Sequence, residues 1–276
     1  MRFSIQDLAK LKRENKRFAT LTSYDFASAI LAERAGAKIL LVGDSMGMVV
    51  HGHETTLPVT VDDIVRHASA VMRGSQSALV VADMPFLSYT NHHDAHRTAA
   101  RLMQEAGVQA VKLEGGTHIA PIVKALVANG VPVMGHLGYT PQSTHQIGVK
   151  VQAKGSEAAR TLIEDALALQ EAGAFAIVLE LVPAELAAEV TKRLQISTIG
   201  IGAGPACDGQ VQVWHDVLGL LPGKPPRHAK VFAPIGDQIV AALSAYVSET
   251  ESGAFPAKEQ SASMSPDALA EALKSQ

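Results

Sequence analysis

Ionisable side chains follow five consecutive apolar segments that have the length of β-strands. The segments read ILLVGDS, ALVVAD, AVKLE, VPVMGH and AIVLE. The side chains in question are Asp44 with Ser45, Asp83, Lys112 with Glu114, His136, and Glu180. A single acid at a strand end is more often a helix cap or a turn residue. Because the pattern repeats on five neighbouring segments, we interpret the set as one functional cluster.

Three of these residues are carboxylates that suit a hard divalent cation. Asp44, Asp83 and Glu114 form a set with oxygen ligands only, without a cysteine or a paired histidine motif. Such a set favours Mg²⁺ or Mn²⁺ over zinc. Mg²⁺ keeps water in part of its coordination sphere, so some of these carboxylates could act through a bound water. The spacing leaves open which ones do.

The remaining groups have structural as well as functional interpretations. Lys112 and Glu114 are two residues apart in a strand, so their side chains share a face, and Lys112 alone could merely neutralise Glu114. His136 alone could be a hydrogen-bonded core histidine. Glu180 lies between two leucines, where a carboxylate is costly unless it is paired or functional. Because all of them meet at one rim, the functional interpretation is favoured.

The elements that must bring these residues together are strands that alternate with helices. The apolar segments predict strands at Phe18–Thr22, Lys38–Gly43, Ala78–Ala82, Gln109–Leu113, Pro132–Gly135, Phe175–Leu179, Ile196–Ile201 and His228–Phe232. Helical periodicity predicts helices at Asp25–Ala35, Val61–Arg73, His93–Ala106, Ile119–Ala128, Ser156–Ala172, Ala184–Leu194, Gln210–Leu220 and Ile235–Val247. Strands separated by helices and buried on both faces imply a parallel sheet. Eight such units predict a single-domain (β/α)₈ TIM barrel, with an open doubly wound sheet as the structural alternative.

Two regions fall outside this alternation. Leu137–Lys154 is a polar insertion after the fifth strand, of the kind that covers an active site. We expect residues 1–250 to form the barrel and residues 251–276 to form a C-terminal tail that packs on the barrel or frays from it. In such barrels the catalytic groups lie at the C-terminal ends of the strands, which is where the ionisable residues occur here.

The composition excludes several classes of function. A net charge of −3, no Lys/Arg run and 4% aromatic residues argue against a nucleic-acid partner. The single cysteine, Cys207, cannot form an internal disulfide and fits a reducing compartment. Without a signal peptide or a membrane-spanning apolar run, we expect no membrane partner and a cytoplasmic location. An apolar fraction of 47% with few aromatic residues favours a homo-oligomer.

Longer motifs around these residues resemble one family. The motifs LLVGDSMGMVVHGHETTLPVT, VVADMPFLSY, AVKLEGG, VPVMGHLGYTPQS and GIGAGPACDGQVQVWHDVLGL occur in the order typical of ketopantoate hydroxymethyltransferases. The resemblance runs from TSYD at Thr22–Asp25 to SGAFP at Ser252–Pro256 and so covers nearly the whole chain. The final segment, AKEQSASMSPDALAEALKSQ, carries no motif of the family.

The resemblance implies a Mg²⁺-dependent barrel enzyme of pantothenate biosynthesis. It implies transfer of a hydroxymethyl group from 5,10-methylenetetrahydrofolate to 3-methyl-2-oxobutanoate through a metal-stabilised enolate, which gives 2-dehydropantoate. The implied metal ligands are Asp44, Asp83 and Glu114. The implied substrate-binding residues are Asp44, Ser45, Asp83, Lys112 and His136, and Glu180 is implied as the proton acceptor. The family also forms ring-shaped homo-oligomers, often decamers.

Three alternatives stay open at this point. A metal-dependent carbon–carbon lyase or mutase of the isocitrate lyase type would share the barrel, the metal and a small 2-keto acid substrate. Such enzymes use a cysteine-bearing catalytic loop, whereas Cys207 follows the seventh strand. An aldolase that forms a Schiff base through Lys112 would need a neutral lysine, which nearby carboxylates disfavour. A scaffold barrel without activity would neither bind Mg²⁺ nor exchange substrate protons.

Overall fold

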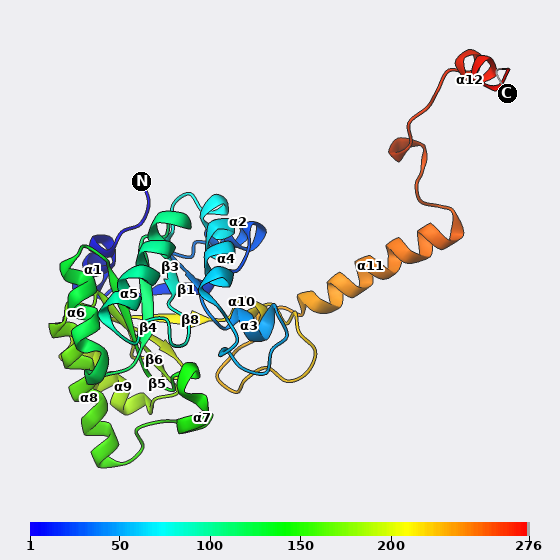
Figure 1. Ribbon diagram of the computed structural model, residues 1–276. Coiled ribbons are helices and arrows are strands. Elements are labelled where there is room, and N and C mark those ends of the chain that lie inside the picture. Colours follow the sequence, from blue (N-terminus) through cyan, green and yellow to red (C-terminus); the bar gives the residue numbers. More distant parts are fainter. Residues whose placement is uncertain (275–276) are drawn as a thin grey trace.

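Eight short parallel strands pair in sequence order and close into a barrel (Figure 1). The strands are β1 (Phe18–Thr22), β2 (Ile39–Val42), β3 (Leu79–Asp83), β4 (Ala110–Glu114), β5 (Val133–Gly138), β6 (Ala176–Glu180), β7 (Ser197–Ile201) and β8 (Gly209–Gln212). The barrel closes because β8 pairs with β7 on one side and β1 on the other. This computed structural model describes residues 1–274 and confirms the predicted (β/α)₈ architecture.

Helices cover the outside of the barrel between the strands (Figure 1). The longer ones are α2 (Phe26–Arg34), α4 (Val61–Gly74), α5 (His92–Ala100) with a π-helical turn (Arg101–Glu105), α6 (Ala120–Ala128), α8 (Ser156–Glu171) and α9 (Ala184–Arg193). Short helices follow three strands, namely α3 (Met46–Val49) after β2, α7 (Thr144–Ile147) after β5 and α10 (Trp214–Val217) after β8. Two 3₁₀ turns, Thr117–Ile119 and Pro141–Ser143, complete the loops after β4 and β5.

The strands separate two apolar layers. Within β2, Ile39 and Leu41 belong to the cluster inside the barrel, while Leu40 and Val42 belong to the cluster between strands and helices. This alternation is the period of two that a strand imposes on its side chains. Helix α1 (Ile5–Arg13) supplies Leu8, fully buried, to the inner cluster. The interior of the barrel is therefore largely filled by apolar side chains, and the buried ionisable groups Asp44, Asp83, Lys112, Glu114 and His136 lie at the C-terminal strand ends.

The eighth strand lies earlier in the chain than predicted. We expected it at His228–Phe232 and expected a helix over Gln210–Leu220, and both expectations are wrong. The strand is the four-residue segment GQVQ at Gly209–Gln212, and only Trp214–Val217 is helical. A short strand with two glutamines lacks an apolar run, yet pairing with β1 and β7 closes the barrel there. The more apolar segment ends in the exposed Phe232.

The C-terminal part of the chain leaves the barrel. Helix α11 (Ile235–Ser252), a 3₁₀ turn (Lys258–Gln260) and α12 (Pro266–Leu273) extend away from it as an arm (Figure 1). The boundary at residue 250 stays a prediction, and residues 275 and 276 of the expected tail lie outside the described residues. Among residues 1–274, no helix is both long and apolar enough to cross a membrane.

Glu33 at the end of α2 fixes the connection between α4 and β3. Its carboxylate accepts hydrogen bonds from the Ser75 hydroxyl (2.7 Å) and from the backbone amides of Gln76 (2.9 Å), Ser77 (3.0 Å) and Ala78 (3.1 Å). Burial alone would raise the pKa of Glu33, but the backbone amide of Ser77 and the other donors outweigh it and lower the pKa to about 2.

We expect Glu33→Gln to destabilise the fold by about 1–2 kcal/mol at pH 7, because a charged acceptor of several hydrogen bonds is lost. A lowered native pKa stabilises above the ordinary value of 4.5, and this contribution disappears as the pH falls from 4.5 to about 2. Urea unfolding should therefore show a similar difference from wild type at pH 7 and pH 5 and a smaller difference at pH 3. Glu171→Gln, exposed on α8, is the matched control, and a difference that does not shrink would contradict the assignment.

Candidate active site

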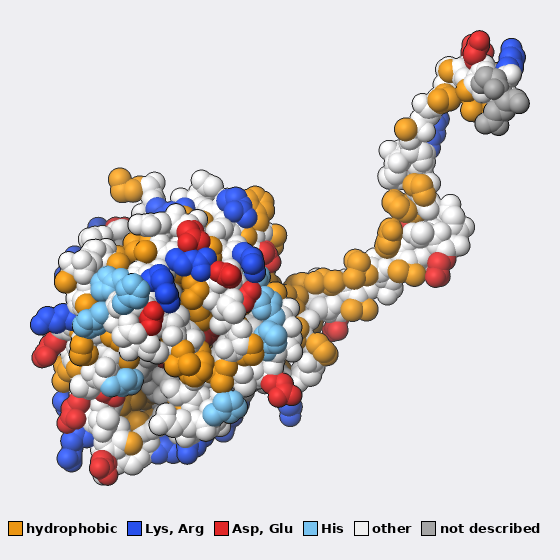
Figure 2. All heavy atoms as spheres, viewed as in Figure 1, with side chains coloured by type: hydrophobic (Ala, Val, Ile, Leu, Met, Phe, Trp, Pro, Cys, Tyr) orange, Lys and Arg blue, Asp and Glu red, His pale blue; other side chains and the backbone are white. Residues whose placement is uncertain are grey.

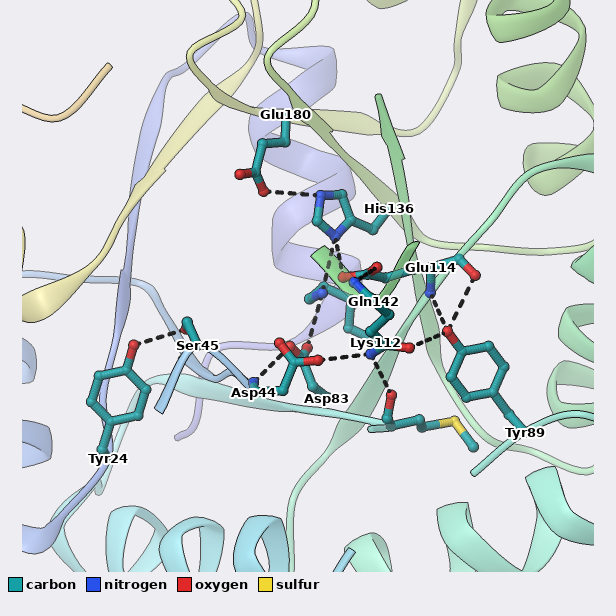
Figure 3. A network of polar contacts seen from close by, with 11 residues as sticks. Tyr24, Asp44, Ser45, Asp83, Tyr89, Lys112, Glu114, His136, Gln142 and Glu180 are labelled. Atoms are coloured by element: carbon teal, nitrogen blue, oxygen red, sulfur yellow. Dashed lines mark hydrogen bonds and ion pairs between the residues drawn. The ribbon is translucent and has the colours of Figure 1, made fainter. Parts of the chain in front are cut away.

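The strand register brings the predicted residues to the same level at the barrel mouth. Asp83 pairs with Lys112 on the neighbouring strand, and Glu114 pairs with His136 on the next. All the predicted site residues line one cavity of about 560 Å³. Figure 3 shows their side chains converging from β2 to β6. The geometry thus places them together, while the role of each stays a prediction.

Lys112 is buried at the centre of the cluster. Its Nζ lies 3.1 Å from Asp83 Oδ1, and both side chains are at most 4% exposed. Burial alone would lower the pKa of Lys112, but the carboxylates of Asp83 and Glu114 outweigh it and raise that pKa. The lysine is therefore a fixed positive charge at neutral pH.

His136 connects the centre of the cluster to Glu180. Its Nδ1 lies 3.3 Å from Glu114 Oε1, and its Nε2 lies 3.2 Å from Glu180 Oε2 (Figure 3). Burial and the nearby Lys112 oppose protonation of the imidazole, yet the two carboxylates outweigh them and raise the pKa of His136 to about 9. Its Nδ1 also lies 3.2 Å from Lys112 Nζ, so His136 lies between the Lys112–Glu114 pair and Glu180 at the cavity.

The buried surroundings of Asp44 and Asp83 disfavour a negative charge on both carboxylates. The backbone amide of Asp44 donates to Asp83 Oδ2 (3.1 Å), which keeps the two side chains close. Burial raises the pKa of Asp44 well above its usual range, and the charge of Asp83 raises it further. Burial also raises the pKa of Asp83, although Lys112 opposes the shift. A cation between these acids would relieve both shifts.

Gln142 joins the cluster from the insertion after β5, and the sequence did not identify it. The side-chain amide donates to Asp44 Oδ2 (2.8 Å) and to the carbonyl of Met84 (3.0 Å), and its backbone amide donates to Glu114 Oε2 (3.0 Å). Tyr89 completes the network by donating to Gln142 Oε1 (2.6 Å). The insertion thus covers the site as predicted, and Gln142 orients two of the three carboxylates.

Ser45 lies on the other side of Asp44 from Lys112 (Figure 3). Its hydroxyl is hydrogen bonded to the Tyr24 hydroxyl at 2.9 Å, and Tyr24 is a second residue that the sequence did not identify. Both hydroxyls can donate or accept, so Ser45 can turn towards a ligand without losing its position.

The backbone around Glu180 is unusual in two places. Gly138 has a φ of 92°, and a Cβ atom there would lie 2.2 Å from the carbonyl oxygen of Glu180. The next amide, from Tyr139, donates to this same oxygen (2.7 Å). Leu181 has a φ of 47°, which leucine rarely adopts. Glycine at 138 is therefore required for β5 to pack against the end of β6, and the strain at Leu181 lies next to Glu180.

The site has the ligand chemistry of a hard cation. Asp83 Oδ1 and Glu114 Oε1 are buried and accept no hydrogen bond of good geometry, although each lies near a cationic nitrogen. Within residues 1–274, no three His, Cys, Asp or Glu side chains already surround one point. Mg²⁺ needs only one or two protein carboxylates when water and substrate complete its shell. Asp44 and Asp83 fit that requirement, because the hydrogen bond from the Asp44 amide keeps their two carboxylates close together in the cavity.

Sequence comparisons identify relatives along the whole chain. Residues 2–258 match the family model described as ketopantoate hydroxymethyltransferase. The 3-methyl-2-oxobutanoate hydroxymethyltransferase of Gluconacetobacter diazotrophicus is 63% identical over 276 residues, which is 100% of both chains. The protein of the same name from Chloroflexus aurantiacus is 55% identical over 276 residues, covering 100% of this chain and 98% of the relative.

Solved structures with a similar fold are far more distant in sequence. A phosphonopyruvate hydrolase complex with oxalate and Mg²⁺ has a TM-score of 0.63 at 13% identity and covers 94% of this chain and 93% of the other. A 2,3-dimethylmalate lyase, described as a PEP mutase/isocitrate lyase superfamily member, has a TM-score of 0.59 at 19% identity, with 100% and 98% covered. These likenesses concern the fold alone. The full-length sequence matches decide the assignment: the chain belongs to the ketopantoate hydroxymethyltransferase family of transferase enzymes.

Proposed function

We propose that this protein transfers a hydroxymethyl group from 5,10-methylenetetrahydrofolate to 3-methyl-2-oxobutanoate and so forms 2-dehydropantoate. Family membership implies a role in pantothenate biosynthesis. The observation that carries the proposal is that one cavity contains two separate groups of charged side chains. The buried carboxylates of Asp44 and Asp83 lie beside Lys112, and a separate carboxylate, Glu180, lies across His136 from them.

Asp44 and Asp83 would hold the divalent cation, with Glu114 acting through water or substrate contacts. When bound, the cation supplies Lewis-acid stabilisation of the negative charge that develops on the keto oxygen. Lys112 is placed to attract the carboxylate of the keto acid as a point charge, and Ser45 can hydrogen bond to it. Gln142 keeps Asp44 and Glu114 oriented before any ligand arrives.

Glu180 is placed to take the proton from C3 of the keto acid. Its side chain is 14% exposed, more than its partner His136 at 4%, so its carboxylate faces the cavity. Removal of the C3 proton leaves an enolate. Water cleaves the two C–N bonds of the donor's methylene group, which releases formaldehyde and leaves one proton on each nitrogen of tetrahydrofolate. C3 of the enolate then adds to the formaldehyde carbon, and protonation of its oxygen gives the hydroxymethyl group. His136 lies 3.2 Å from Glu180 and would keep this carboxylate oriented towards the cavity.

The surroundings of Lys112 argue against the Schiff-base alternative. A lysine nucleophile must be neutral part of the time, which requires an apolar or cation-rich pocket. Here Asp83 lies 3.1 Å from the ammonium group and raises its pKa. The lyase alternative has support from fold likeness alone, at 13–19% identity among the structures compared above.

Exchange of the C3 proton tests the proposal directly. Wild-type protein with Mg²⁺ should exchange the C3 proton of 3-methyl-2-oxobutanoate in D₂O, as followed by NMR, and exchange should not require folate. Addition of 5,10-methylenetetrahydrofolate should convert exchange into product formation. Protein that neither exchanges this proton nor forms product would exclude the proposed reaction.

We also propose that the protein is a homo-oligomer, with α11 as a contact between copies. None of its residues is buried, and its apolar side chains form a row along the arm (Figure 2). Val240, Leu243 and Tyr246 are 54–63% exposed. An apolar helix of 18 residues is not stable in water by itself and requires a covering surface. A second copy of the chain supplies one, because the outside of its barrel after β8 carries only the short α10.

We expect Leu243→Glu to weaken assembly strongly, because a charge then replaces a central apolar contact. Sedimentation velocity at micromolar protein should show a multiple of the 29.0 kDa chain for wild type and smaller species for the variant. Ser244→Glu, on the adjacent position of the same helix, is the control and should sediment like wild type. Monomeric wild-type protein would exclude this interface.

A further inference from the structure

Two further polar side chains line the cavity after the end of β8, across the barrel mouth from β4. His215 and Asp216 line the cavity there together with Thr22 of β1. Helix α10 is fixed to β1, because the backbone amide of Trp214 donates to the Thr22 hydroxyl (2.9 Å). The proposed chemistry of the keto acid uses none of these residues, and the incorrect position of the predicted eighth strand concealed them.

The cavity is larger than the keto acid requires. One water molecule occupies about 30 Å³ in the liquid. If each of the eight non-hydrogen atoms of 3-methyl-2-oxobutanoate takes about the same volume, the keto acid fills less than half of the cavity. The cavity measures about 560 Å³. The keto acid is expected at the carboxylate cluster, so the free volume lies towards β8 and the 218–231 segment.

His215 carries a buried ring nitrogen that has no partner. Its Nδ1 accepts and donates no hydrogen bond within residues 1–274. The ring lies 5.6 Å from the Tyr24 ring between centroids, and the Tyr24 hydroxyl reaches Ser45 (2.9 Å). Burial lowers the pKa of His215, so the ring is neutral and can serve as donor or acceptor. The His215 ring therefore borders the keto-acid site through Tyr24, and its Nδ1 is free to form a hydrogen bond with a ligand.

Asp216 offers an unused carboxylate beside it. It is partly buried, and no hydrogen bond to its side chain occurs in the described part of the chain. A half-buried carboxylate without donors is costly unless a ligand supplies them. The walls between Asp216 and the carboxylate cluster are apolar, with Leu181, Ile201 and Val213 among the lining residues. Such a wall suits a flat heterocycle with polar atoms at its edge.

We infer that the part of the cavity bordered by Tyr24, His215, Asp216 and the 218–231 segment binds the pterin ring of the folate donor. This rests on the proposed function. The amino-pyrimidinone edge of a pterin presents adjacent N–H donors, which match the two oxygens of the Asp216 carboxylate. His215 Nδ1 completes the contact. Lys224, an exposed residue at the outer edge of the cavity, is placed for the glutamate carboxylates of the donor.

Trp214 makes the inference measurable without turnover, because it is the single tryptophan and precedes His215. Tetrahydrofolate, titrated into the Mg²⁺-loaded protein, should quench its fluorescence. Asp216→Asn and His215→Gln should each raise the dissociation constant of tetrahydrofolate about tenfold to a hundredfold, because a buried donor–acceptor match is lost. The KM for 5,10-methylenetetrahydrofolate should rise in parallel. Glu157→Gln, at an exposed acid in the first turn of α8, is the control.

Proton exchange distinguishes a failure of the pterin-site inference from a failure of the proposed function. C3 exchange without folate reports on the keto-acid site and on correct folding, so it should persist in both variants. Wild-type affinity for tetrahydrofolate in both variants, with exchange intact, would overturn the pterin site and leave the proposed function standing. Absence of exchange in wild type would overturn the proposed function and the inference with it.

Discussion

Replacement of Glu180 by glutamine should reduce C3 proton exchange by at least about a hundredfold, the usual contribution of a general base. The amide keeps the size and the hydrogen-bonding capacity of the side chain but cannot accept the proton. Exchange in D₂O, followed by NMR with the keto acid and Mg²⁺, measures the loss without folate. Mg²⁺ affinity should stay within a few-fold of wild type, because Glu180 is separated from Asp44 and Asp83 by His136.

The control for this variant is Glu185→Gln, which removes a carboxylate from the first turn of α9 on the same β–α unit. It should exchange at the wild-type rate. If Glu180→Gln exchanges at nearly the wild-type rate, another group removes the C3 proton. If instead Glu180→Gln loses Mg²⁺ affinity together with exchange, Glu180 belongs to the cation site.

Removal of the divalent cation should abolish turnover, and Asp83→Ala should do nearly the same. The substitution removes a carboxylate that lies 3.1 Å from Lys112 and accepts the Asp44 amide. Lewis-acid stabilisation is worth several kcal/mol, so we expect a loss in kcat of about a thousandfold or more. Calorimetric titration with Mg²⁺ should show weaker binding by the variant, and Mg²⁺ should restore chelator-treated wild type.

Lys112→Ala provides the contrast, because it removes positive charge without removing a ligand. It should chiefly raise the KM for the keto acid and retain Mg²⁺ binding. Borohydride with substrate should leave wild-type Lys112 unmodified, as mass spectrometry of peptides can show. A covalent adduct on Lys112, with activity that survives chelation, would establish the Schiff-base mechanism on the same barrel.

The sequence predicted the barrel and its mouth because both depend on local pattern. Seven strands are apolar runs of the right length, and the acids at the ends of four of them stand out against those runs. The eighth strand was missed because GQVQ has no apolar run and is held by its neighbours β1 and β7. His215 and Asp216 were missed with it, since their position at the mouth depends on where β8 ends.

Contacts between segments far apart in the sequence were a second feature that the sequence could not predict. Gln142 is an ordinary polar residue of a loop in the sequence, and its link to Asp44 spans 98 positions of the chain. The pairing of Tyr24 with Ser45 is equally invisible, because each follows a different strand. The sequence could predict that the strand ends meet. The hydrogen bonds between the loops that follow them depend on tertiary packing, which a local sequence pattern does not reveal.

The anchoring of Gln142 determines the route by which ligands pass. The segment after β5 cannot swing outward without breaking the bonds from Gln142 to Asp44 and Glu114. We expect ligands to pass instead along the side bordered by residues 46–56 and 218–231, where Met48 and Leu221 are exposed at the cavity. In the proposed reaction both substrates would use this opening, with the keto acid in the deeper position at the carboxylate cluster. The proposed reaction should then follow a compulsory order, and we expect the keto acid to enter first and tetrahydrofolate to depart before the product.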